Sequence, residues 1–106
     1  MAELIDGVIF DESMQRLTYG MKDSVKRQTV IAHNVSNKDV AGYKPIRFSD
    51  ELQEMMSRPG FNPERDTVIE EEEMAKMTKN RFKYSTYIRL MNMKLEVLKK
   101  VINQGK

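Results

Sequence analysis

The sequence contains no cysteine, no tryptophan and a single histidine among its 106 residues. Without cysteine, disulfides, thiol catalysis and cysteine-ligated zinc are excluded. No acidic residue lies at a metal-ligand spacing around His33, so we interpret it as a packing or solvated histidine. The sequence also has no phosphate-binding loop, nucleophile elbow or paired acid and base. We therefore expect no enzyme activity, no metal, no cofactor and no small-molecule substrate.

Long hydrophobic runs are also missing. The first residues, MAELIDGVIFDES, include acids and no sustained apolar stretch, which is unlike a cleavable secretion signal. No stretch is long and apolar enough to span a bilayer. The net charge of +2 is too small for whole-chain electrostatics to indicate nucleic acid. These features predict a cytoplasmic protein, or one exported without a cleaved signal.

Proline is scarce, and its three copies all lie between residues 45 and 63. Together with Gly42 and Gly60, they divide the chain into two long segments and a linker. We predict a flexible N-terminal segment over 1–11, a helix over 12–37, a linker over 38–66 and a second helix over 67–104. The predicted fold is all-α, an antiparallel coiled-coil-like hairpin of two long helices that neighbouring subunits complete.

Apolar residues recur at helical spacing in the first long segment. They are Met14, Leu17, Met21, Val25, Ile31, Ala32 and Val35. In the linker, FSDELQEMM predicts a short helix capped by Ser49, with Leu52, Met55 and Met56 on one side. The following RPGFNPERD predicts a loop.

The last segment has the strongest periodicity, with apolar residues three and four apart. This predicted assembly seam consists of Met74, Met77, Tyr84, Ile88, Met91, Leu95, Leu98 and Ile102, with the aliphatic stem of Arg81 in the same line. Thr67 and Glu70 predict a capping box at the helix start. Glu70 to Glu73 match the positive end of the helix dipole, and Lys99 and Lys100 match its negative end.

A second apolar line runs beside the seam. Its residues are Tyr87, Leu90, Val97 and Val101. The two lines together cover an arc of roughly 160°, wider than an ordinary core-facing stripe. One partner helix covers only part of that arc, so we infer that other chains complete the core.

A basic surface gives the main alternative. From Met74 to Lys106 the chain has nine basic residues and one acid, Glu96, a net charge of +8. Such a helix is typical of a soluble binding module for nucleic acid or an anionic membrane. We favour a solvated face, because the basic residues are spread around the helix.

Polar and turn-forming residues follow the first helix. Asn34 and Asn37 lie one turn apart, and their amides can pair with backbone groups left free where a helix stops. Asn37 tolerates left-handed backbone angles, which suits a helix terminator. Gly42 permits a turn and Tyr43 supplies an anchor that packs and hydrogen-bonds.

Taken together, AHNVSNKDVAGYK resembles the N-terminal signature A-x-N-[IV]-A-N-x-x-T-P-G-Y of bacterial flagellar rod, hook and hook-associated axial proteins. Asn34, Asn37, Gly42 and Tyr43 match it, whereas Ser36, Val40 and Ala41 differ. EEEMAKMTKNRFKYSTYIRLMNMKLEVLKKVI resembles the C-terminal helix of the flagellar basal-body proximal rod protein, the FlgB family. The resemblance covers residues from about 10 to 103.

The resemblance implies a structural subunit without enzymatic activity. Such proteins leave the cell through the flagellar type III export apparatus without a cleaved signal and polymerise in the basal body, within the cell envelope or periplasmic space. There they form the proximal rod, which transmits torque from the inner-membrane ring. The implied partners are further copies of the chain, other rod proteins, the rod-to-ring adaptor and the export apparatus. Nucleic acid is not among them.

Overall fold

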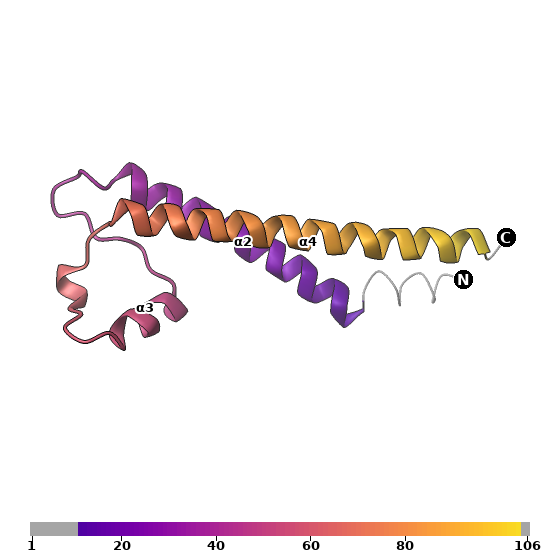
Figure 1. The fold of residues 1–106 in the computed structure, drawn as a ribbon, viewed down its shortest axis with the longest axis horizontal. Coiled ribbons are helices and arrows are strands. Elements are labelled where there is room, and N and C mark those ends of the chain that lie inside the picture. The colour runs from indigo at the N-terminus through magenta and orange to yellow at the C-terminus, as the bar shows by residue number, and fades with distance from the viewer. Residues whose placement is uncertain (1–10, 105–106) are drawn as a thin grey trace. The chain divides into compact units, whose positions relative to one another are not determined.

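The computed structural model describes residues 11–104, which form three α-helices and one short 3-10 turn. The helices are α2 (Glu12–Ser36), α3 (Ser49–Met56) and α4 (Glu70–Gln104), and the 3-10 turn η1 is Pro63–Arg65 (Figure 1). No residue of 11–104 is in a strand. The prediction of an all-α chain with two long helices and a short linker helix is confirmed. Residues 1–10 of the predicted flexible segment lie outside the described range.

The chain divides into two compact units. Within the described range, unit 1 contains residues 11–27 and 79–104, so it joins the first part of α2 to most of α4. Unit 2 contains residues 28–78, which include the end of α2, the linker and the first turns of α4.

In unit 1 the two long helices pack against each other in opposite directions. The Asn80 side chain donates to the Ser24 carbonyl oxygen at 2.7 Å, and the Lys94 ammonium donates to the Asp11 carboxylate at 2.6 Å. As residue numbers rise along α4, those of the partners on α2 fall, which is the antiparallel pairing that the sequence predicts.

Hydrogen bonds near the first residue of each long helix show where that helix begins. The Asp11 carboxylate accepts a hydrogen bond from the Met14 backbone N–H at 2.8 Å and so caps α2. The predicted start of the last helix at Thr67 is wrong, because α4 begins at Glu70. Thr67 is not its cap: the Thr67 carbonyl instead accepts a hydrogen bond from Arg47 at 3.2 Å, which holds this residue outside the helix.

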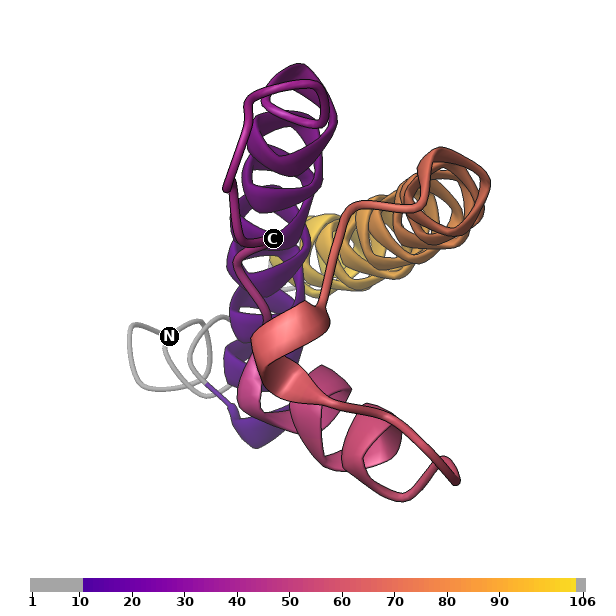
Figure 2. The same cartoon turned by 90° about the vertical axis from the view of Figure 1, so that its left-hand side faces the viewer.

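The linker of unit 2 is more structured than its sequence indicates (Figure 2). Ser49 is the first residue of α3 rather than its cap, and the Glu51 carboxylate accepts from the Phe48 N–H at 3.3 Å in that role. Within the predicted loop, Asn62 caps η1 by accepting from the Glu64 N–H at 3.0 Å. Proline at the first position of η1 suits such a start, because its missing N–H would have no partner there.

Polar side chains dominate the buried positions. Ile31 is the one hydrophobic residue among 11–104 that is buried, and it lies on α2. The buried polar and charged residues in that range are Ser24, Asn34, Glu73 and Asn80. Fifteen large hydrophobic residues in the same range are exposed. Hydrogen bonds and ion pairs therefore specify this fold more than a hydrophobic core does.

Candidate assembly surface and helix-end motif

Asn34 is the centre of a hydrogen-bonded cluster at the end of α2. Its side chain is 1% exposed. Its amide nitrogen donates to the Ile46 carbonyl oxygen at 3.0 Å, and its amide oxygen accepts from the Ile46 N–H at 2.9 Å. The same oxygen accepts from the Tyr43 hydroxyl at 2.7 Å. One side chain thus binds both backbone groups of a residue twelve positions later and anchors the returning chain to the helix.

The turn between these partners depends on Gly42. The Tyr43 N–H donates to the Val40 carbonyl at 3.1 Å, and Gly42 has a φ of +76°. A side chain at this φ is strained, which explains why glycine occupies the position. The Tyr43 ring then meets the exposed His33 ring edge-on, with centroids 5.9 Å apart.

Asn37 ends α2 by a different route from the predicted one. Its φ is not positive, since Gly42 and Gly60 are the residues with positive φ in the described range. Its side-chain amide donates to the His33 carbonyl at 2.8 Å, and its backbone N–H donates to the same carbonyl at 3.2 Å. The side chain therefore adds a second donor to a carbonyl at the helix end, and the helix stops without a left-handed residue at Asn37.

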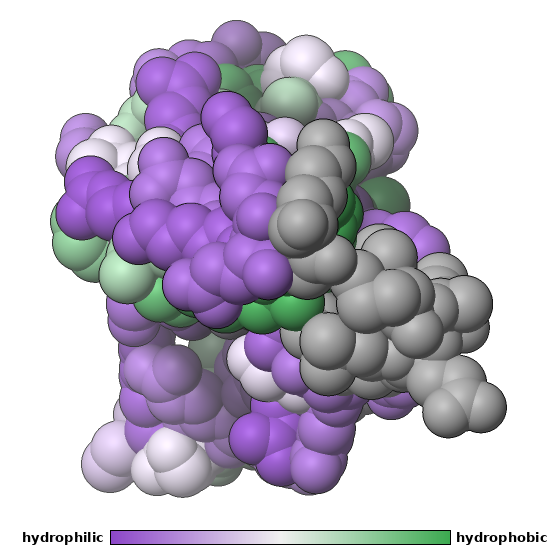
Figure 3. Space-filling view, turned by 90° about the vertical axis from the view of Figure 1, so that its right-hand side faces the viewer, coloured by the Kyte–Doolittle hydropathy of each residue, from purple (hydrophilic) through white to green (hydrophobic). Residues whose placement is uncertain are grey.

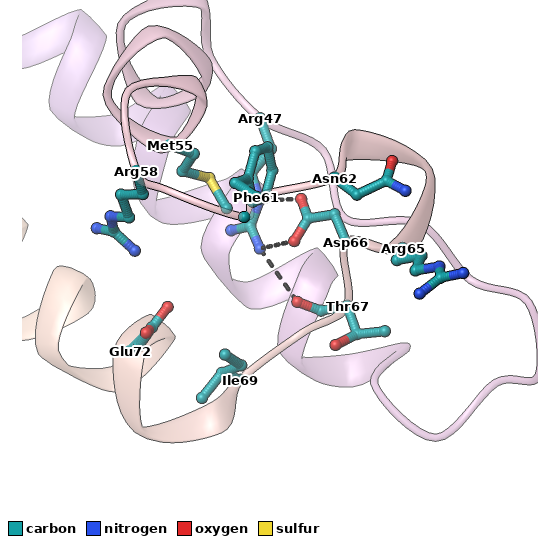
Figure 4. A pocket seen from close by; sticks show the side chains of 11 residues that line it. Arg47, Met55, Arg58, Phe61, Asn62, Arg65, Asp66, Thr67, Ile69 and Glu72 are labelled. Atoms are coloured by element: carbon teal, nitrogen blue, oxygen red, sulfur yellow. Dashed lines mark hydrogen bonds and ion pairs between the residues drawn. The ribbon is translucent and has the colours of Figure 1, made fainter.

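Arg47 joins the linker to the start of α4 within unit 2. Its guanidinium binds the Asp66 carboxylate at 2.9 Å and the Glu73 carboxylate at 2.6 Å. Figure 4 shows the bonds to Asp66 and to the Thr67 carbonyl. Burial lowers the pKa of Arg47, but its hydrogen bonds to Asp66 and Glu73 outweigh burial and raise it. This planar donor group suits several acceptors at once and stays charged.

Glu73 does more than match the positive end of the helix dipole, because it is buried in a network of ion pairs. Its side chain is 1% exposed, and its Oε1 binds both Arg47 and the Lys76 ammonium, the latter at 2.7 Å. Lys76 also binds the Glu51 carboxylate of α3 at 2.8 Å. Consecutive ion pairs thus link the linker, α3 and the first turns of α4. Glu70, by contrast, is exposed and pairs with Lys38 at 2.8 Å, and this hydrogen bond raises the pKa of Lys38.

A shallow cavity of about 430 Å³ lies beside this network (Figure 4). Its wall includes Arg58, Arg65 and Glu72 together with the apolar side chains of Phe61 and Ile69. Arg47 also lines it, but the carboxylates of Asp66 and Glu73 already occupy its guanidinium.

A close approach of α2 and α4 depends on Gly20. A Cβ atom built at Gly20 would lie 2.5–2.8 Å from three carbons of the Tyr87 ring. No real Cβ tolerates such distances, so only glycine lets this ring pack against α2. The inner face of α2 in unit 1 therefore includes two small buried residues, Gly20 and Ser24, which receive Tyr87 and Asn80 of α4.

The structure divides the predicted seam and second line between two environments. The partly buried members are Met77, Ile88, Met91 and Leu98 from the seam and Tyr87 and Val101 from the second line. The exposed members are Met74, Tyr84, Leu95 and Ile102 from the seam and Leu90 and Val97 from the second line. Arg81 is also exposed. The face of α4 that meets α2 thus runs between the two predicted lines, and exposed apolar residues flank it on both sides.

Sequence reasoning missed the polar contacts. Asn80, Ser24 and Gly20 interrupt the apolar pattern, so counting hydrophobic residues assigns them no packing role. Arg47 and Glu73 are common surface residue types, and their 26-residue separation leaves no local signal of pairing. The one available hint is that the basic Arg47 is followed by Asp66 at the end of the predicted loop and by the acids Glu70 to Glu73.

Residues 11–104 contain no helix with the length and apolar character to cross a bilayer. In the same range no three acidic or histidine residues are grouped so that they could hold a metal ion. No protein-family model, curated protein or solved structure in these comparisons matches the chain.

Proposed function

We propose that this protein is a structural subunit of the bacterial flagellar basal-body rod, in the proximal part nearest the inner-membrane ring. Copies of the chain polymerise through their long helices and transmit torque. Further rod proteins, the rod-to-ring adaptor and the flagellar export apparatus are its other partners. The place of assembly is the basal body within the cell envelope.

The exposed apolar surface of α4 is the observation that carries this proposal. Leu95 is 45% exposed and Val97 is 54% exposed, on opposite flanks of the face that meets α2. Ile31 is the single buried hydrophobic residue in the described range. A chain with so small a core gains stability when neighbouring chains cover its flanks, as subunits of a polymer do.

The helix-end motif adds support. The residues that carry the resemblance to flagellar axial proteins act together: Asn34 binds the Tyr43 hydroxyl, and Gly42 makes the turn between them. This cluster fixes the direction in which the chain leaves the helix. Rigid helix ends of this kind keep a rod stiff, because torque cannot be absorbed by rotation of the linker.

The alternative of a basic binding helix has weaker support. Lys94 and Lys76 are engaged in ion pairs with Asp11 and with Glu51 and Glu73. Lys83 and Lys99 lie on opposite sides of α4 by helical geometry, so the positive charge is divided between faces. A salt titration with duplex DNA separates the two functions, since binding through phosphates weakens steeply as salt rises.

The direct test replaces Leu95 by aspartate in the source bacterium. We expect Leu95→Asp to abolish rod assembly and swimming while the protein is still exported, because a charge on the exposed flank cannot be buried against a neighbour. Asn92→Asp adds the same charge at an exposed polar position and should leave both unchanged. Ile88→Asp should also abolish assembly, but it is partly buried and so also weakens the hairpin.

Deletion of the gene provides the decisive outcome. Intact basal bodies and normal swimming without this chain would refute the rod function. Normal assembly of Leu95→Asp with loss of assembly on deletion would instead refute the assignment of this flank.

A further inference from the structure

The two units carry opposite net charge. Among the described residues, unit 1 has eleven basic and four acidic residues, a net charge of +7. Unit 2 has six basic and ten acidic residues, a net charge of −4. The net charge of +2 for the whole chain conceals this separation.

On α4 the positive charge lies beside exposed apolar residues. Lys83, Leu90 and Val97 follow one another at intervals of seven residues. A neighbouring column contains Lys79, Met93 and Lys100, at intervals of fourteen and seven residues. Residues seven apart lie on nearly the same side of a helix. All six are exposed, Met93 to 58%. We call this surface the basic strip. Figure 3 shows hydrophobic surface beside strongly hydrophilic surface on one side of the molecule.

The exposed face of α3 has the complementary composition. Leu52 and Met56, one turn apart, are 39% and 57% exposed. Asp50 and Glu54 are exposed too, and Ser49–Met56 contains no basic residue. Glu54 pairs with Arg58 at 3.3 Å, but both side chains remain mostly exposed. Helical geometry places the apolar pair along one edge of this face and the two acids along the other. Apolar and charged groups therefore occur together on both surfaces, with opposite sign.

We propose that α3 of one copy of this chain docks on the basic strip of a second copy. This inference rests on the proposed rod function and names the contact that builds the polymer. Two basic strips, or two α3 faces, would oppose like charges, which disfavours a symmetric dimer through either surface. Contact between two different surfaces is heterologous, so the copies at the two ends of a chain each keep one surface free. Further copies can then add, and the chain stays open unless its rotation closes a ring.

Sedimentation of the full-length purified chain tests this contact with three double variants. The α3 variant is Gln53→Lys with Glu54→Lys, and the strip variant is Lys83→Glu with Lys100→Glu. The control, Arg16→Glu with Lys22→Glu, makes the same charge change as the strip variant, but on α2. All six residues are exposed, so circular dichroism should show unchanged helix content in each variant.

We expect the wild type and the control to self-associate, with affinity falling on the order of tenfold from low to high salt. Each of the other two variants should fail to self-associate. An equimolar mixture of those two should form a mixed complex, because the α3 face of the strip variant and the basic strip of the α3 variant are both unaltered.

Three outcomes would overturn the proposal. An α3 variant that self-associates like the wild type would show that the contact excludes α3. A control that loses self-association as fully as the strip variant would show that net charge, and not the basic strip, determines association. Failure of the mixture to associate would show that the two surfaces do not meet. None of these bears on whether deletion abolishes the rod, so the two proposals fail separately.

Discussion

Replacement of Asn34 by alanine should release the linker from the end of α2. The substitution removes three hydrogen bonds, two to the Ile46 backbone and one to the Tyr43 hydroxyl. At about 1 kcal/mol net for each bond, local stability falls by about 3 kcal/mol. Ile46 is 47% exposed, so water reaches its backbone once it is released, and the loss stays at this size rather than rising to that of fully buried orphan groups.

Amide hydrogen exchange of Ile46, followed by NMR, measures this local release. A loss of about 3 kcal/mol corresponds to exchange faster by on the order of a hundredfold. Tyr43→Phe removes one of the three bonds and should accelerate exchange roughly fivefold. Asn37→Ala is the matched control, because it removes a different amide cap and should leave Ile46 unchanged. Unaltered exchange of the Ile46 amide in Asn34→Ala would refute the reasoning.

Three further perturbations probe the other contacts. Gly20→Ala should destabilise the helix pair by about 1–3 kcal/mol in chemical denaturation, because its Cβ meets the Tyr87 ring. At an exposed helical site the same substitution stabilises, so a Gly20→Ala variant more stable than the wild type would contradict the close approach. Adding Tyr87→Ala should restore part of the lost stability. Arg47→Met should cost about 3–5 kcal/mol, since it leaves the Glu73 and Asp66 carboxylates without their buried partner; a denaturation midpoint equal to that of the wild type would exclude the network as a stabilising element. Hydrogen bonds from Lys94 and from the Met14 N–H lower the pKa of Asp11 below its ordinary 3.8. The contribution of ionised Asp11 to folding stability is therefore present above pH 3.8 and is lost as pH falls through the lower folded-state pKa. In an NMR titration Lys94→Gln should raise the pKa of Asp11, and an unchanged pKa would argue against the pair.

The elements with strong periodicity were predictable from the sequence. The long helices follow from their apolar spacing, and an antiparallel hairpin was the pairing expected for two such helices. The end of the first helix was predictable within one residue, because Asn37 and the Gly-Tyr turn mark it. The first residues of the later helices were not predictable. Ser49 and Thr67 both match capping patterns, but the Glu51 carboxylate accepts the hydrogen bond at the start of α3. Thr67 lies outside α4, where its carbonyl accepts a hydrogen bond from Arg47.

The candidate site was predictable in part. Asn34, Gly42 and Tyr43 were identified as a helix-end motif, and the structure joins them through one amide. The placement of each apolar residue on α4 was not predictable, because it depends on small residues of α2 that leave room for Tyr87 and on the Asn80 contact with Ser24. Such contacts arise between residues more than fifty positions apart, where periodicity within one helix carries no information.

The scarcity of buried apolar residues has a thermal consequence. Exposure of apolar surface raises the heat capacity on unfolding and exposure of polar surface lowers it. Since Ile31 is the only buried hydrophobic residue in the described range, whereas Ser24, Asn34, Glu73 and Asn80 are buried polar ones, the heat-capacity increment of the single chain should fall below the usual ~12–15 cal/mol/K per residue. Its stability curve is then flat and broad, with cold denaturation displaced to temperatures far below freezing.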